Sequence, residues 1–133
     1  DYETRLNSAS GKTYRDYGYI INQHVIDYCM ISYFGAEAYY SKQAEHVNDL
    51  RINPLNFSTA EGSKLPKTLV IAAEHDVLRD ENVAFAEKLQ KLNVPCELFI
   101  GKGEIHGFFQ GFHNLKENRN KVIDLLVKFM ERE

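Results

Sequence analysis

The chain has 133 residues, a length that fits one domain with its own hydrophobic core, and its 44% hydrophobic and 26% charged residues are an ordinary globular composition. Sixteen Lys and Arg residues oppose nineteen Asp and Glu residues, a balance that argues against nucleic-acid binding and against membrane attachment driven by charge. No apolar run approaches the roughly 20 residues that a membrane span requires.

The first predicted element in chain order is a helix over about residues 17–34. Ile21, Val25 and Tyr28 repeat at helical spacing, and Gly35 is a natural helix terminator. Apolar side chains also occupy most of the remaining circumference of this helix. We therefore expect other parts of the protein to cover it on several sides.

Residues 35–66 differ in composition from the segments on either side. Asn, Pro, Ser and Gly recur there, so short helices and loops are expected. We place a boundary in this region, between a helical and loop segment over residues 1–60 and a second segment over residues 61–133. Cys29 and Cys96 have neither metal-binding nor redox spacing and lie among apolar residues, which predicts that both are buried and inert.

A strand-helix-strand unit is predicted in the second segment. Residues 68–73 are apolar and β-branched, as in a strand that is buried on both faces of a parallel sheet. A second strand is expected at about residues 95–100, followed by a turn at residues 101–103 before His106. Between them, residues 80–92 have apolar residues at helical spacing after an acidic start. A closing amphipathic helix is predicted over about residues 115–132. Its apolar stripe consists of Val122, Leu125, Leu126, Phe129 and Met130.

Two side chains that can carry protons follow the two predicted strands. Asp76 and His106 lie 30 positions apart, about the length of one strand-helix-strand unit, which places both loops at the same edge of a parallel sheet. A neutral imidazole can accept a proton from a hydroxyl group, while a carboxylate on its other nitrogen fixes the tautomer and stabilises the cation. Each residue also has an ordinary interpretation, Asp76 as a turn former or helix cap and His106 as polar surface. Their order fits the second and third members of the hydrolase order nucleophile, acid, histidine.

The residues around both side chains form longer motifs. Residues 65–81 read Leu-Pro-Lys-Thr-Leu-Val-Ile-Ala-Ala-Glu-His-Asp-Val-Leu-Arg-Asp-Glu, and residues 105–109 read Ile-His-Gly-Phe-Phe. These motifs resemble the acid loop and the histidine loop of the hormone-sensitive-lipase-like family of α/β-hydrolase esterases. Residues 18–39 resemble a segment that helps to build the cap over that family's active site, and residues 53–55 resemble its Ser-Pro-Leu turn. The resemblance covers about residues 1–130 and corresponds to the C-terminal half of such an enzyme.

The resemblance implies an α/β fold, namely the C-terminal portion of an α/β-hydrolase with its last two parallel strands and their flanking helices. Residues 1–60 would contribute to the cap, and residues 61–133 would carry the acid and histidine loops. Asp76 takes the acid role and His106 the general base and acid role in a carboxylesterase or lipase that cleaves small-molecule esters through an acyl-enzyme. The charged residues after the acid have an ordinary interpretation as surface or helix-cap residues, namely Arg79, Asp80 and Glu81. By analogy with the family, they would brace the acid loop.

The nucleophile of such an enzyme is not found in this sequence. No serine has the paired glycines of a Gly-x-Ser-x-Gly elbow, and no His-Gly-Gly oxyanion loop occurs. In the family both motifs come earlier, and Asp1-Tyr2 resembles the residues just after the sixth strand. We therefore expect the sequence to begin mid-fold, to be inactive alone, and to be completed by the N-terminal half of the fold or by another subunit. Without an initiator Met, the natural start is expected upstream, and the compartment stays open.

Two alternatives remain at this point. One is a hydrolase-derived binding module without catalysis, and the other is a truncation product without a function of its own.

The glycines from Gly101 to Gly107 are one residue off a dinucleotide fingerprint, and His24, His46 and His113 have no partner at metal-ligand spacing. We therefore expect no cofactor, no metal and no nucleic-acid partner. The tyrosines of residues 14–40 are expected to pack in the interior, or by analogy with the family to line an acyl pocket.

Overall fold

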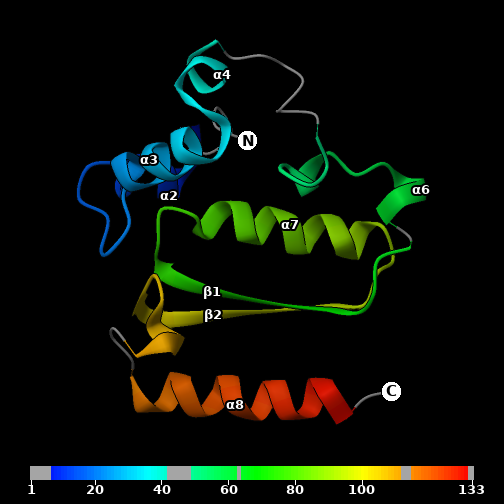
Figure 1. Cartoon of the computed structure of the whole chain (residues 1–133). Helices are drawn as coiled ribbons and strands as arrows, with labels where there is room; N and C mark the ends of the chain where they lie inside the picture. Colours follow the sequence, from blue (N-terminus) through cyan, green and yellow to red (C-terminus); the bar gives the residue numbers. More distant parts are fainter. Residues whose placement is uncertain (1–6, 42–48, 63, 112–114, 132–133) are drawn as a thin grey trace.

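The computed structural model describes residues 7–41, 49–62, 64–111 and 115–131, and Figure 1 shows their arrangement. Two strands and a set of helices follow one another along the chain. In order they are α2 (Ala9–Thr13), α3 (Gln23–Phe34), α4 (Ala36–Tyr40), η1 (Pro54–Asn56), α6 (Thr59–Gly62), β1 (Thr68–His75), α7 (Arg79–Lys91), β2 (Cys96–Ile105), η2 (Phe108–Gln110) and α8 (Lys116–Glu131).

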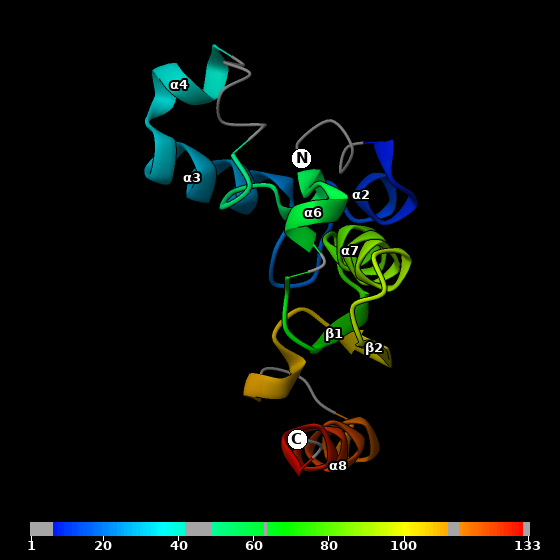
Figure 2. The same cartoon turned by 90° about the vertical axis from the view of Figure 1, so that its right-hand side faces the viewer.

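The second half of the chain forms three layers. The strands β1 and β2 pair in parallel, with Thr68 opposite Cys96 and Ala73 opposite Gly101. Helix α7 connects them and covers one face of the sheet, while α8 covers the other face (Figures 1 and 2). The predicted strand-helix-strand unit is therefore confirmed, and α7 begins one residue before its predicted start.

The second strand is longer than predicted. Residues 101–103 were expected to form a turn, but β2 continues to Ile105 through an irregular stretch. Ala73 pairs with Gly101 and His75 pairs with Ile105, so extra residues of β2 bulge at this point. Gly103 has a φ of +72° there, and its backbone N–H donates to Glu74 Oε2 at 2.8 Å. The glycines permit a turn, but the Glu74 carboxylate satisfies the backbone of the bulge and keeps it against the sheet.

Buried residues lie on both faces of the sheet, including Ala86 and Leu89 of α7, and one core cluster lies between the sheet and α8. Ala73 of β1, Phe108 of η2 and Val122 of α8 are buried together, and Ile71, Phe99 and Leu126 pack against them. Helix α8 ends close to its predicted end, although Arg132 lies outside the described residues. Within the predicted apolar stripe, Val122 is fully buried, whereas Met130 is 67% exposed.

Helix α3 begins later than its apolar pattern predicted. Its first residue is Gln23, and Asn22 Oδ1 accepts the Val25 backbone N–H at 3.1 Å, which caps the helix in the usual way for Asn. Ile20 has a φ of +69°, a left-handed conformation that no helix continues through. The predicted end is confirmed, because Gly35 has a φ of +83° and donates its N–H to the Ile31 carbonyl at 2.8 Å.

The prediction that the tyrosines pack in the interior was wrong for several of them. Four are largely exposed, namely Tyr17, Tyr28, Tyr33 and Tyr40. Cys29 is also exposed, contrary to the prediction, and Cys96 is half-buried. The physical reason is that α3 packs mainly against α4 and lies beyond α7, on the side away from α8 (Figure 1). Residues 35–41, 49–62 and 64–66 form short helices and loops as expected, and the boundary near residue 60 stays a prediction.

Candidate active site

The structure brings Asp76 and His106 together. Asp76 follows β1 directly and His106 follows β2 directly, and these parallel neighbours end at the same edge of the sheet. His106 Nδ1 lies 2.9 Å from Asp76 Oδ2. Asp76 is only 5% exposed, whereas the His106 side chain is 40% exposed. A buried carboxylate thus holds one nitrogen of an imidazole that solvent can reach.

The remaining carboxylate oxygen of Asp76 is also occupied. Oδ1 accepts the Leu78 backbone N–H at 2.9 Å, and the Asp76 carbonyl accepts the Arg79 backbone N–H at 3.1 Å. These bonds form the turn that leads from β1 into α7. An ionised carboxylate can only accept, so the hydrogen on the shared bond belongs to His106 Nδ1. In the neutral imidazole the lone pair is then on Nε2, which is the nitrogen that can take a proton from a hydroxyl group.

His106 has a buried residue two positions away on each side in the sequence. Glu104, before it, is fully buried, and Phe108, after it, is 4% exposed. Between His106 and Phe108, Gly107 has a φ of +72°, a conformation that costs glycine little and other residues considerably more. The chain therefore turns sharply beside the imidazole while the phenyl ring enters the core.

Ser10, which the sequence did not single out, braces the acid loop. It is fully buried, and its Oγ donates to the Val77 carbonyl at 3.2 Å. The Asp80 backbone N–H donates to Ser10 Oγ at 3.2 Å, and the Ser10 N–H donates to Asp80 Oδ2 at 2.8 Å. Leu78, the N-cap residue of α7, makes no side-chain capping bond. Ser10 of α2 supplies this function across the fold, and no local sequence signal could have shown it.

The bracing role inferred for Arg79 and Asp80 has a geometric basis. Arg79 Nε donates to Asp80 Oδ1 at 2.9 Å, and Arg79 Nη1 donates to the Glu74 carbonyl at 3.2 Å. The two residues thus connect the end of β1 to the first turn of α7 and, through Ser10, to α2. The role expected for Glu81 stays a prediction.

The Asp80 carboxylate predicts an acid-dependent loss of stability. Partial burial raises the pKa of Asp80, but the hydrogen bonds from Ser10 and Arg79 outweigh burial and lower the pKa below its ordinary value of 3.8. A depressed pKa contributes stability that is present above the unfolded-state value and is lost as the pH falls through the folded-state value.

We expect the free energy of unfolding to fall more steeply for the wild type than for Asp80→Asn below about pH 4. Urea denaturation at pH 7, 4 and 3 measures this difference, because the other carboxylates are common to both proteins. Parallel pH profiles for the two proteins would contradict the assignment.

A second contact lies next to Asp76. Tyr14 Oη is 2.8 Å from His75 Nδ1, and the Tyr19 ring meets the same imidazole edge-on with 6.2 Å between ring centroids. The residue immediately before the acid is thus in contact with the segment between α2 and α3. These contacts add a second tie between the first segment of the chain and the acid loop.

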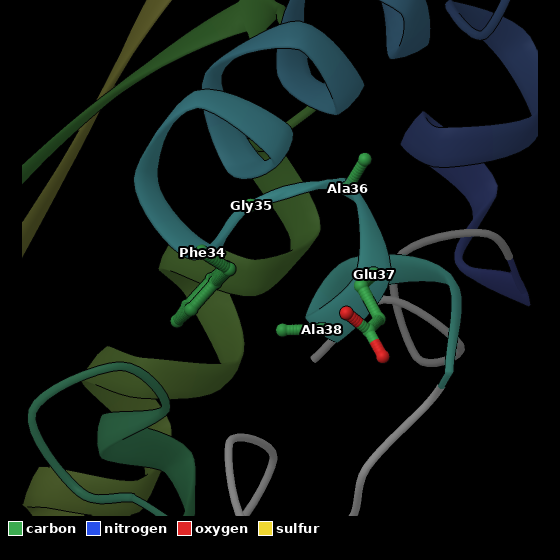
Figure 3. A pocket seen from close by; sticks show the side chains of 5 residues that line it. All are labelled: Phe34, Gly35, Ala36, Glu37 and Ala38. Carbon is green, nitrogen blue, oxygen red and sulfur yellow. The ribbon is translucent and has the colours of Figure 1, made fainter.

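Figure 3 shows a surface hollow at the junction of α3 and α4. Five consecutive residues line it, namely Phe34, Gly35, Ala36, Glu37 and Ala38. Neither Asp76 nor His106 contributes to this hollow, and Glu37 is its one charged lining residue. It is therefore distinct from the acid and histidine loops.

Metal-binding clusters and membrane-spanning helices are both absent from the residues that the structure describes. In that part of the chain, no group of three or more His, Cys, Asp or Glu side chains is arranged to hold a metal ion. No helix within the described ranges has the length and apolar character needed to cross a bilayer. His46 and His113 lie outside the described residues.

Comparisons with known proteins agree with this geometry. The family model for the alpha/beta hydrolase fold matches residues 2–110. The arylesterase of Saccharolobus solfataricus is 33% identical over 104 residues, which are 77% of this chain and 31% of the relative. Lipase 2 of a Moraxella species is 31% identical over 80 residues, which are 59% of this chain and 18% of the relative.

Solved structures show the same likeness. An esterase from the fungus Rhizomucor miehei has a TM-score of 0.72 and 25% identity, and the match covers 96% of this chain and 36% of that one. The brefeldin A esterase, a bacterial homologue of human hormone-sensitive lipase, has a TM-score of 0.67 and 26% identity over 97% of this chain and 34% of that one. The chain thus spans about a third of the length of these structures. It belongs to the α/β-hydrolase fold family, among relatives that are esterases and lipases similar to hormone-sensitive lipase.

Proposed function

We propose that this chain supplies the acid and the base of a serine carboxylesterase, with the nucleophilic serine coming from residues outside these 133. The observation that carries the proposal is the 2.9 Å bond between His106 Nδ1 and the buried Asp76 Oδ2. It is supported by the esterases and lipases among the relatives. A purely binding pocket has no need of a buried acid that fixes the tautomer of an exposed histidine.

The geometry gives His106 and Asp76 distinct roles. His106 Nε2 takes the proton of the serine hydroxyl as its oxygen attacks the ester carbonyl carbon, and Asp76 stabilises the resulting imidazolium without taking its proton. The same proton passes from Nε2 to the departing alkoxide, which leaves as the alcohol. Water then attacks the acyl-enzyme, gives a proton to Nε2, and the serine recovers a proton as the carboxylic acid leaves. Residues 1–60 contribute to the cap in this proposal.

Fluorophosphonate labelling tests the proposal directly, because the reagent requires a serine activated by a neighbouring base. We expect the assembled protein, with the serine-bearing part included, to be labelled and the 133-residue chain alone not to be labelled. His106→Ala should abolish labelling, whereas His24→Ala, at an exposed position of α3, should leave it unchanged. Labelling of the isolated chain would show that it contains its own nucleophile.

If the assembled protein is not labelled but still binds esters, the pair does not serve catalysis. That result would favour the alternative of a hydrolase-derived binding module. Binding is measured separately by calorimetry with a non-hydrolysable ester analogue, so catalysis and recognition are distinguished in the same preparation.

A further inference from the structure

Glu104 is a buried carboxylate for which the proposed reaction has no step. It is fully buried and lies two residues before His106 in the last part of β2. Burying a carboxylate is costly unless donors satisfy it. Here the Leu115 backbone N–H donates to Glu104 Oε1 at 2.6 Å, and Asn118 Nδ2 donates to the same oxygen at 3.0 Å. Both donors lie at the start of α8 or immediately before it.

Asn118 makes the connection double. Its Nδ2 also donates to the Lys102 carbonyl at 2.8 Å, so one buried amide joins both sides of the β2 bulge to the first turn of α8. Glu104 and Asn118 therefore join the end of β2, directly before His106, to the first turn of α8. A backbone segment that is held in this way has fewer conformations available to the residues that it carries.

Packing reinforces the hydrogen bonds. A Cβ added to Gly101 would lie 3.0 Å from Glu104 Cγ and 3.1 Å from Phe108 Cζ, so both side chains press against the backbone of the bulge. Phe108 packs with Ala73 and Val122 in the core. His106 is thus held through buried neighbours two residues away on each side, while its own side chain stays partly exposed.

We propose that Glu104 is a positioning residue for His106, whose buried carboxylate ties the end of β2 to α8 and so keeps the imidazole within reach of Asp76. It acts through the backbone and does not touch the reacting atoms. The expected loss of kcat rests on the proposed function, whereas the expected displacement of the His106 imidazole does not. Displacement of a catalytic group by about 1 Å can cost roughly 100-fold in rate, so a small movement of His106 is measurable.

The test compares Glu104→Ala with Glu104→Gln. Alanine leaves the Leu115 N–H and Asn118 Nδ2 without their shared acceptor, whereas the glutamine amide oxygen can accept both bonds. We expect Glu104→Ala to lower kcat by about tenfold or more with little change in KM, and Glu104→Gln to stay within about threefold of the wild type. Glu117→Ala is the matched control, because this α8 carboxylate is 78% exposed and pairs with Lys121.

NMR supplies a readout that does not depend on ester turnover. We expect the His106 Nδ1 proton, which is hydrogen-bonded to Asp76, to resonate at low field in the wild type. Glu104→Ala should broaden or lose this signal, whereas Glu104→Gln and Glu117→Ala should retain it. Asn118→Ala removes one donor to Glu104 and the bond to the Lys102 carbonyl, and it should give the same but weaker change. It replaces Glu104→Ala as the test if Glu104→Ala does not fold. An unchanged Nδ1 signal and unchanged kcat in folded Glu104→Ala, or in Asn118→Ala where that variant replaces it, would overturn the proposal and leave a role in stability alone. No ester hydrolysis by the wild type would overturn the proposed function, and the Nδ1 signal would still decide the role of Glu104.

Discussion

Replacing Asp76 by Asn is expected to lower kcat of the assembled enzyme by about 10⁴, as in the corresponding substitution of serine-protease triads. The structure gives the reason. The Leu78 N–H at 2.9 Å from Oδ1 requires an acceptor, so the amide oxygen of Asn takes that position and its NH₂ group faces His106. Nδ1 must then accept, the hydrogen moves to Nε2, and Nε2 can no longer take a proton from serine.

Two measurements separate this mechanism from simple unfolding. Ring nitrogen chemical shifts of His106 should show the hydrogen on Nδ1 in the wild type and on Nε2 in Asp76→Asn. Asp124→Asn, at an exposed position of α8, removes one carboxylate elsewhere and should leave both kcat and the tautomer unchanged. Turnover of Asp76→Asn close to that of the wild type would refute the acid role of Asp76.

The sequence predicted those features that depend on local pattern. Strand β1 was predicted from its apolar run and helix α7 from its acidic start and apolar spacing, all of which are patterns of residues close in sequence. Both elements were found close to their predicted bounds. Placing Asp76 and His106 at one sheet edge needed only the geometry of a parallel strand pair. The order of the elements thus predicted that the two residues lie close together, and the structure places His106 Nδ1 2.9 Å from Asp76 Oδ2.

The failures have two physical causes, a local helix cap in one case and a contact between neighbouring strands in the other. The apolar residues before Gln23 suggested more helix, but Asn22 caps the helix there and Ile20 is left-handed. The glycines of residues 101–103 suggested a turn, but Glu74 on the neighbouring strand stabilises a bulge. Neither the start of the helix nor the bond across the strands is visible in the periodicity of apolar residues.

The largest omission was Ser10, whose partners are 67 and 70 positions away. Its sequence neighbours gave no sign of a functional role. Like the other serines of the chain, it lacks the paired glycines of a nucleophile elbow. The structure shows instead that it connects α2 to both Val77 and Asp80, on either side of the turn that follows Asp76. The candidate site thus includes a part of the first segment that no local motif marks.

Removal of this hydroxyl should have a large effect on stability. Ser10→Ala removes the buried partner of two backbone groups, the Val77 carbonyl just before α7 and the Asp80 N–H in its first turn. A buried polar group that loses its partner costs about 1–3 kcal/mol, and the lost cap of α7 falls within the same range. We expect the free energy of unfolding, measured by urea denaturation, to fall by about 2 kcal/mol or more.

The matched control is Ser41→Ala, because Ser41 is exposed and its hydroxyl donates one bond to the Ala38 carbonyl at 3.2 Å. This variant should lose less than about 0.5 kcal/mol. Combining Ser10→Ala with Asp80→Ala tests whether the two residues act as one unit, since reciprocal partners should show a coupling energy of about 0.5–3 kcal/mol. Additive losses would mean that Ser10 and Asp80 stabilise the acid loop independently, and a loss for Ser10→Ala no larger than that of Ser41→Ala would mean that Ser10 does not brace it.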